Sequence, residues 1–353
     1  MNDRRNLVHF LLDNMIWILL IVVVVIFSLL TNLFLTVNNL VGNILVDAAV
    51  LGIMVIGQSF TLITGNFDLS MESTLGIAAF LGAWLVAPAG SATHGSGFSV
   101  NIVISVAAML AVGLVIGWVN GTLITRLKMN NFIATLAMLI VIRGTVLVTS
   151  DGHTISRLPG AFVGIGQAQI GFLPISVIVL IVAFAVAHLV MRYTVFGRDI
   201  YAVGGSVTGA YAAGIDPLRR TRQVYLVSGV LAALSGWMLS ARIGVAVPRL
   251  GQGMILEVFA AAVIGGISLN GGRGGMLGAF AGVLLMSSID AGLNLMRVSS
   301  FWIQTVRGLV ILLAIFIDAQ KVRLSGRKSS LGSIVLKRDM ARQAPMKDGT
   351  AEL

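Results

Sequence analysis

Two carboxylates four residues apart, Asp68 and Glu72, lie in the stretch GNFDLSMES (residues 65–73), between two long apolar runs. Such a pair could perform acid–base chemistry, bind a cation or contact a solute. A cation site needs more oxygen ligands than two acids provide, and the neighbouring sequence offers no further oxygen-rich cluster. At the start of a helix, free amides and the helix dipole favour negative charge. Helix capping is therefore the simpler interpretation, and a role in gating or solute contact is the alternative.

Sequence motifs for enzymatic chemistry are missing. The chain has no cysteine, which excludes thiolate metal sites and a cysteine nucleophile. It has no His-Glu-x-x-His or Gly-x-Ser-x-Gly motif, and the stretch GGRGG (271–275) lacks the Lys-Ser/Thr ending of a Walker phosphate loop. The four histidines are scattered over different segments: His9, His94, His153 and His188. We expect a protein that is not an enzyme and that carries no metal or cofactor of its own.

Several ionisable residues fall inside or at the ends of apolar runs, where an unpaired charge is costly. They are Asp47, Asp68, Glu72, Arg143, Glu257, Asp290 and Arg307. Arg143 lies about 18 Å of helix rise into its run, near the middle of a membrane. It lines a hydrated path or pairs with a carboxylate at that depth, or it is a snorkelling or structurally paired arginine. The acids near the ends of runs favour structural roles.

The elements that must position these residues follow from composition. The chain of 353 residues is 57% hydrophobic and only 11% charged, so lipid is the expected solvent for most of its surface. A membrane-spanning helix needs ~20 mostly apolar residues. Runs of that kind lie at 15–35, 44–64, 71–90, 100–123, 131–150, 173–191, 223–241, 254–270, 275–294 and 300–317. The sequence therefore predicts an all-α membrane protein of about ten transmembrane helices.

The distribution of basic residues predicts the orientation. Most of the 24 Lys and Arg residues fall in segments that share one side if both termini are cytoplasmic, as the rule that cytoplasmic loops are Lys/Arg-rich requires. We expect a cytoplasmic N-terminus (1–14), a transmembrane domain (15–318) and a basic cytoplasmic tail without periodicity (319–353). The net charge of +10 does not form a basic helix with interleaved aromatics, which argues against nucleic acid as a partner.

Two connecting segments are long enough to carry a function. Residues 151–174 fall outside on this topology, and residues 192–222 fall inside, where a short helix would meet a protein that docks from the cytoplasm. The chain also contains a partial internal repeat, because Gly65-Asn66-Phe67-Asp68-Leu69-Ser70 is similar to Gly265-Gly266-Ile267-Ser268-Leu269-Asn270. Each stretch precedes a Gly-rich apolar run, which indicates a duplicated helical hairpin.

The order of several motifs resembles a known family. GNFDLS, NNFIATLAMLIVIRG (130–144), FGRDIYAVGGS (196–206), VYLVSGVLAALSG (224–236) and AAVIGGISLNGGRGG (261–275) are similar, in order and spacing, to membrane permeases of ABC importers for monosaccharides. These permeases are of the ribose, xylose, galactose and arabinose type, together with permeases for a furanosyl signalling molecule. The resemblance runs from about residue 15 to residue 320.

The resemblance implies a ten-span inner-membrane permease that works with a second copy or a related permease chain. It implies cytoplasmic ATP-binding subunits, which would hold ATP and Mg, and an extracytoplasmic sugar-binding protein. The segment that couples to the ATPase would be Gly204, Gly205, Ala212, Ala213, Gly214, Ile215 and Asp216. This segment lacks the leading Glu of many other importer permeases.

One departure concerns the opening stretch. Family members commonly read Gly-Gly-Ile-Asp-Leu-Ser-Val-Gly-Ser, and this chain keeps Gly65, Asp68, Leu69, Ser70 and Ser73. Glu72 stands where the pattern has glycine, and Asn66, Phe67 and Met71 also differ. Asp68 therefore belongs to the shared pattern and Glu72 does not.

We expect the permease subunit of an ATP-driven importer for a monosaccharide or similar small polyol. Candidates for the path or its gate are Asp68, Ser70, Asn131, Thr135, Arg143 and Gln304, with Gln58, Asn66 and Asn294 as further candidate linings. One alternative is a permease for another solute of the superfamily, a branched-chain amino acid or a nucleoside. A proton- or sodium-driven transporter would need carboxylates at the midplane, and a scaffold would not need an intramembrane Arg143.

Overall fold

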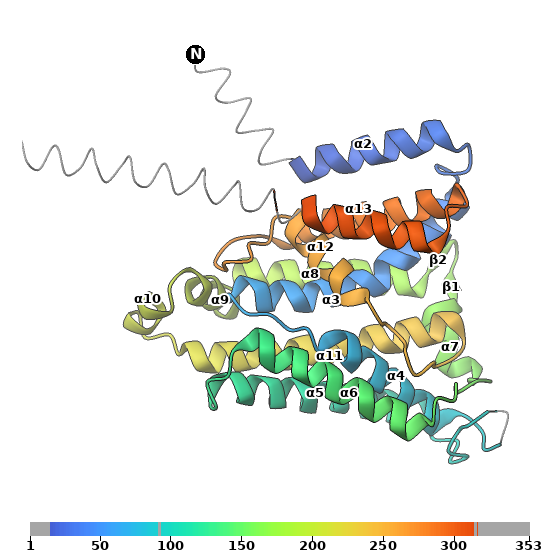
Figure 1. Ribbon diagram of the computed structural model, residues 1–353, viewed down its shortest axis with the longest axis horizontal. Helices are drawn as coiled ribbons and strands as arrows, with labels where there is room; N and C mark the ends of the chain where they lie inside the picture. The colour runs from blue at the N-terminus through green and yellow to red at the C-terminus, as the bar shows by residue number, and fades with distance from the viewer. Residues whose placement is uncertain (1–14, 91–92, 314–315, 317–353) are drawn as a thin grey trace, which may run out of the picture.

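The computed structural model describes residues 15–90, 93–313 and 316 (Figure 1). The expected cytoplasmic N-terminus (1–14) and basic tail (319–353) lie outside the described residues. Nearly all regular structure is helical, with one two-stranded antiparallel ribbon, β1 (Gln169–Ile170) paired with β2 (Leu173–Pro174).

Within the described residues, six helices are long and apolar enough to cross a membrane. They are η1–α3 (Asn38–Ile63), α5 (Ile102–Thr125), α6 (Asn131–Ser150), α8 (Ile175–Tyr193), α11 (Pro217–Ile243) and α13 (Met276–Leu295). Four shorter apolar helices are α2 (Met15–Leu30), α4 (Met71–Val86), α12 (Met254–Ile264) and a last helix, Ser300–Leu313. Each of the ten apolar runs predicted from sequence overlaps one of these helices.

Among the boundaries that differ from the prediction, two have clear local reasons. The run 254–270 holds a helix of only 11 residues, because Gly265 and Gly266 end it and Gly266 takes a positive φ of 89°. Helix α11 begins at Pro217, earlier than the predicted 223. Proline suits the first turn of a helix, and Asp216 accepts hydrogen bonds from the amides of Leu218 and Arg219.

Short elements lie at the two ends of the helical bundle. Figure 1 shows α9 (Val195–Gly205) and α10 (Val207–Ala212) at one end, and α7 (Gly160–Gln167) with the β-ribbon at the opposite end. The predicted short helix in 192–222 is therefore present as two helices. The predicted surface element in 151–174 is α7 with the ribbon.

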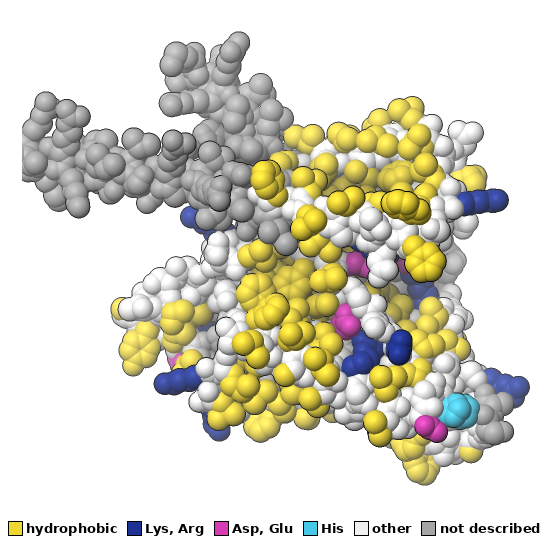
Figure 2. Space-filling view, in the orientation of Figure 1, with side chains coloured by type: hydrophobic (Ala, Val, Ile, Leu, Met, Phe, Trp, Pro, Cys, Tyr) yellow, Lys and Arg dark blue, Asp and Glu magenta, His cyan; other side chains and the backbone are white. Residues whose placement is uncertain are grey.

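Helix α11 forms the centre of the bundle by packing on α3, α4 and α5. Its contact with α5 is close because Gly113 and Gly229 face each other, and a Cβ at either would overlap the other's carbonyl oxygen. Small residues of this kind let membrane helices approach at backbone distance. Figure 2 shows that much of the surface is hydrophobic, with a patch of acidic and basic side chains in the middle of one face.

Candidate functional site

Two helix joints are built in the same way. We call residues 63–70, from the last residue of α3 to the N-cap of α4, the first joint, and residues 265–275, between α12 and α13, the second joint. The amides of Gly65 and Asn66 donate to Leu62 and Thr61, both at 2.9 Å, and the amides of Gly266 and Ile267 donate to Val263 and Ala262 at 2.9 and 3.0 Å. Both are Schellman ends with glycine at positive φ. The sequence repeat thus has a structural counterpart, but geometry pairs Gly65 with Gly266, one residue away from the alignment of the sequence.

The two joints touch each other, and α9 packs on both. The amide of Gly272 donates to the carbonyl of Ile63 at 2.8 Å. Gly204 of α9 sits against this contact so closely that a Cβ there would overlap the Ile63 oxygen and lie 2.5 Å from the Gly272 nitrogen. The Tyr201 hydroxyl donates to the carbonyl of Gly274 at 2.7 Å. Burial raises the pKa of Tyr201, which keeps this hydroxyl protonated as a donor.

The other residues of the predicted coupling segment lie on the rim of this end. Gly205, Ala212, Ala213, Gly214 and Asp216 are exposed and Ile215 is half-buried. Next to them Val207 and Tyr211 expose 60% and 76% of their surface. Asp199 of α9 pairs with Arg220 of α11 at 2.6 Å, which ties the rim to the bundle. This end therefore combines an exposed apolar surface with a direct backbone contact to both joints.

Asp68 lies in a buried hydrogen-bond network that joins the first joint to α5 and α11. Only 1% of Asp68 is exposed. Its Oδ1 accepts from the amide and hydroxyl of Ser70 at 3.1 and 2.7 Å, and its Oδ2 accepts from the Ser228 hydroxyl at 2.7 Å. Asn120 donates to the Ser70 hydroxyl at 2.7 Å, and Tyr225 donates to the Phe67 carbonyl at 2.7 Å. Asp68 thus organises the start of α4 and also binds a second helix.

Glu72 lies in the first turn of α4, as the capping interpretation expected, but its carboxylate binds groups outside this helix. Its Oε2 accepts from the amides of Gly253 and Ile255, at 2.9 and 3.3 Å. Gly253 is the N-cap residue of α12, and Ile255 lies in its first turn. Asp68 and Glu72 consequently face different partners. Glu72 is 5% exposed, and a buried carboxylate needs such donors to offset its desolvation.

Arg143 pairs with Glu72, and a carboxylate partner was among the alternatives expected for this residue. Its Nη2 lies 3.4 Å from Glu72 Oε1, and its Nη1 donates to the carbonyls of Leu250 and Pro248 at 3.0 and 3.4 Å. Helices α4 and α6 thereby hold the segment that precedes α12. We call these two side chains the Glu72–Arg143 clamp.

The remaining intramembrane charges form a second group. Arg307 of the last helix binds both oxygens of Asp290 at 2.9 and 2.8 Å and also pairs with Glu257. Arg242 pairs with Asp47. These pairs join five helices and agree with the structural roles expected for residues near run ends. Among the described residues, no three His, Cys, Asp or Glu side chains gather as metal ligands.

The other predicted path residues are divided between several places. Asn131 donates to Asn66 Oδ1 at 3.0 Å beside the first joint, and the buried Thr135 hydroxyl donates to the Asn131 carbonyl at 2.8 Å. Gln304 is exposed on the last helix. Gln58 is fully buried, and its amide atoms have no hydrogen-bond partner among the described residues. The structure therefore brings Asn131 and Asn66 together beside the first joint. Gln304 takes no part in the hydrogen bonds described for that joint.

Sequence reasoning missed the partners of these residues. Asn120, Tyr225 and Ser228 carry polar groups inside apolar runs, which is the signal that could have marked them. The carbonyls of Pro248 and Leu250 carry no such signal, because backbone groups look alike in every sequence.

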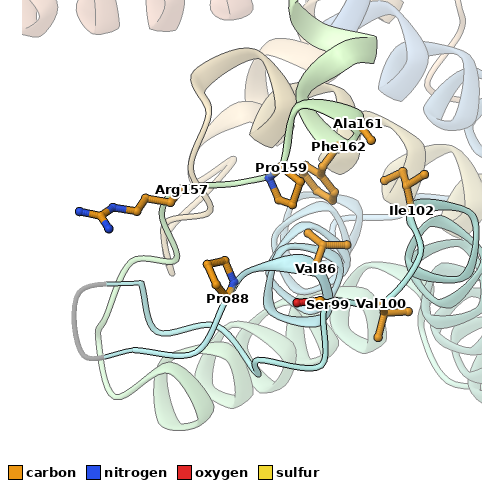
Figure 3. Close-up of a pocket in the computed structure, with 9 residues that line it drawn as sticks. All are labelled: Val86, Pro88, Ser99, Val100, Ile102, Arg157, Pro159, Ala161 and Phe162. Carbon is orange, nitrogen blue, oxygen red and sulfur yellow. The ribbon is translucent and has the colours of Figure 1, made fainter.

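A cavity of about 410 Å³ lies at the end that holds α7 (Figure 3). It is lined by Val86, Pro88, Ser99, Val100, Ile102, Arg157, Pro159, Ala161 and Phe162. Figure 3 shows Arg157 extending away from the other lining side chains. The cavity thus has an apolar wall and a basic side chain at its edge.

The helices and joints described above lie within a segment that matches a known family. The family described as "Branched-chain amino acid transport system / permease component" matches residues 40–315, which include both joints, α9 and the clamp. The chain belongs to this family. It is accordingly a multi-pass membrane protein.

Curated relatives share most of the chain. It is 37% identical over 304 residues to the ribose import permease protein RbsC of Bacillus subtilis (strain 168), covering 86% of this chain and 91% of the relative. It is 33% identical over 287 residues to the L-arabinose ABC transporter permease protein AraH of Azospirillum brasilense, covering 81% of each. It is 30% identical to the xylose transport system permease protein XylH of Haemophilus influenzae (strain ATCC 51907 / DSM 11121 / KW20 / Rd), covering 86% of this chain and 96% of the relative. No solved structure matches the chain.

Proposed function

We propose that this chain is the permease subunit of an ATP-driven ABC importer that moves a monosaccharide or similar small polyol across the inner membrane. The observation that carries the proposal is the similarity, along at least four-fifths of the chain, to permeases named for ribose, arabinose and xylose. The geometry supports it, because one end of the bundle contacts both helix joints through α9.

The proposed topology has ten spans with α9 and α10 in the cytoplasm. Basic residues support this orientation. Arg192 and Arg219 lie near the ends of the helices that flank α9 and α10, and Arg198 lies in α9. Arg126 and Lys128 follow α5, whose last residue, Thr125, accepts a hydrogen bond from Arg222 near the start of α11. The exposed rim around Val207 and Tyr211 would receive the ATP-binding subunit. The opposite end, with α7 and its cavity, would receive the sugar-binding protein. A second permease copy or a related chain would complete the path, within membrane lipid and without nucleic acid.

The mechanism assigns no chemistry to the permease. ATP and Mg would be bound by the partner subunits, and this chain would convert their movement into alternating access. Displacement of α9 reaches the first joint at Ile63 and the second joint at Gly272 and Gly274, because Gly204 and Tyr201 contact them directly. Movement of the joints would then change the positions of α4 and α12, which start and end there.

Uptake by the reconstituted complex tests this function. The permease, the ATP-binding subunit and the binding protein encoded with it are placed in proteoliposomes with ATP inside, and radiolabelled ribose, L-arabinose and xylose are offered outside. We expect ATP-dependent uptake of at least one of these sugars. Uptake of leucine or a nucleoside instead would establish another solute of the superfamily. Uptake driven by a proton or sodium gradient without ATP would overturn the proposal.

The orientation is tested by cysteine labelling. The chain has no cysteine, so no native cysteine has to be removed before single cysteines are introduced. Val207→Cys in α10 and Gln169→Cys in β1 both carry exposed side chains, at opposite ends of the bundle. We expect a membrane-impermeant maleimide to label Gln169→Cys in intact spheroplasts and Val207→Cys only after lysis. The reverse pattern would overturn the topology.

A further inference from the structure

The segment 244–253, which connects α11 to α12, reaches the middle of the membrane without being helical. Arg143 is the thirteenth residue of the 20-residue helix α6, about 18 Å along its axis, and the hydrocarbon core is about 30 Å thick. Because Arg143 binds the carbonyls of Pro248 and Leu250, these residues lie at that depth. The segment therefore enters from the end that holds α7, where Ala246 pairs with Ile155, and stops near the midplane.

The clamp binds both carbonyl and amide groups of this segment and of the start of α12. Arg143 binds its carbonyls and Glu72 binds the amides of Gly253 and Ile255. Gly76 of α4 leaves room for the arrangement, since a Cβ there would lie 3.1 Å from the Leu250 oxygen and 3.2 Å from Arg143 Nη1. The backbone of the segment is thus satisfied by protein, as any non-helical chain at membrane depth requires.

Two side chains of the segment are polar and exposed. Arg249 and Gln252 point to the surface, while Leu250 between them is 5% exposed. Among the described residues, no carboxylate forms an ion pair with Arg249. Glu72 pairs with Arg143, and the acids of the other ion pairs bind Arg220, Arg242 or Arg307. An unpaired guanidinium near the midplane is costly against lipid and is tolerated where it faces water or protein. Figure 2 shows charged side chains of both signs in the middle of one hydrophobic face.

We propose that Arg249 and Gln252 line the translocation path and donate hydrogen bonds to hydroxyl groups of the passing solute, and that Glu72 with Arg143 positions them. A guanidinium and a carboxamide together offer several N–H donors and one acceptor, which suits the hydroxyl-rich surface of a monosaccharide. This inference rests on the proposed function for the identity of the solute, but not for the exposure of the two side chains to water.

Cysteine accessibility tests the location. Arg249→Cys and Gln252→Cys are introduced singly into the full transporter, and their reaction with a charged methanethiosulfonate is followed. Val141→Cys is the matched control, because Val141 is 59% exposed and lies on the side of α6 opposite Arg143. We expect both segment cysteines to react, Val141→Cys to stay unreactive, and ribose, L-arabinose or xylose delivered by the binding protein to slow the reaction.

The other outcomes of this experiment overturn the proposal. Unreactive segment cysteines that form a disulfide between two copies would place Arg249 and Gln252 in a dry permease–permease interface. Unreactive cysteines without a disulfide would place them against lipid or buried protein. If wild-type transporter imports none of the three sugars while the segment cysteines still react, the assignment of the solute fails and the location of the path stands.

The positioning role of the clamp has a separate readout. Glu72→Gln keeps the size of the side chain but removes the charge that holds Arg143. We expect Glu72→Gln to change the labelling rate of Gln252→Cys severalfold and to raise the KM for uptake. Thermal unfolding should also move to a lower temperature, because Arg143 loses its carboxylate partner in a largely buried site. Arg143→Lys keeps the positive charge, but an ammonium cannot reproduce the geometry with which the guanidinium binds Glu72 and the two carbonyls. This variant should therefore shift the labelling rate in the same direction. Unchanged labelling and KM in both variants would show that the clamp positions nothing on the path.

Discussion

Replacing Gly204 with alanine is expected to abolish coupled transport and to lower the stability of the permease. The added Cβ would overlap the Ile63 carbonyl oxygen and lie 2.5 Å from the Gly272 nitrogen, and neither backbone atom can rotate away. Overpacking costs about 1–3 kcal/mol when side chains can yield, and more is expected here because only backbone is present. The measurements are ATP-dependent sugar uptake, ATPase activity of the complex and the thermal unfolding of the permease in detergent.

Gly205 provides the matched control for this experiment. It follows Gly204 in α9, but a Cβ at Gly205 has no atom within 4 Å. Gly205→Ala should therefore fold with the stability of wild type. If Gly204→Ala behaves like Gly205→Ala, then the contact between α9 and the joints carries no movement and the proposed coupling route is wrong.

A milder variant keeps the test decisive if Gly204→Ala does not fold. Tyr201→Phe removes one hydroxyl and its hydrogen bond to Gly274, and leaves the ring in place. We expect this variant to retain ATPase activity and lose part of its uptake, so that fewer solutes cross for each ATP hydrolysed. An unchanged ratio of uptake to hydrolysis would argue against the coupling route.

Replacing Asp68 with alanine is expected to produce the second large effect. It would leave two hydroxyls and one amide without their acceptor in a site that is 1% exposed. Each unsatisfied buried group costs about 1–3 kcal/mol, so the sum approaches the total stability of many domains. Thermal unfolding and the yield of folded permease in detergent measure this loss.

Asp68→Asn separates the structural role of Asp68 from a role in gating. The amide oxygen still accepts from Ser70, and the Ser228 hydroxyl can rotate to accept from the new amide nitrogen. We expect Asp68→Asn to fold with nearly wild-type stability. Loss of uptake in this folded variant would show that the negative charge is used during transport. An Asp68→Ala variant with wild-type stability would contradict the importance of the network.

Much of the fold could be predicted from the sequence, because hydropathy indicates the membrane helices and glycine indicates where some of them end. All ten apolar runs contain helices, and the resemblance to sugar-importer permeases is confirmed by the family match and the relatives. The helix end at Gly65 could be predicted because Schellman ends favour glycine at positive φ. The short length of α12 was missed, since residues 267 and 269 continue the apolar run after the chain has left the helix.

The contacts of the ionisable residues could not be predicted in the same way. The partner amides of Glu72 lie 181 and 183 residues later in the chain, and no local rule connects positions so far apart. Local helix rules predict that Glu72 caps its own helix, α4. In the folded protein its carboxylate instead accepts hydrogen bonds at the start of α12. Arg143 was recognised from depth alone, because a charge in the middle of an apolar run needs a partner wherever that partner lies.

The clamp also bears on how the chain is assembled during synthesis. Helix α12 has 11 residues and rises about 16 Å, so it cannot span the bilayer alone and must enter together with α13. Glu72 and Arg143 are made long before residues 253–255 emerge, and until then the Glu72 carboxylate has only Arg143 to neutralise it. The ion pair between them thus neutralises both charges in the apolar membrane until α12 and α13 are inserted.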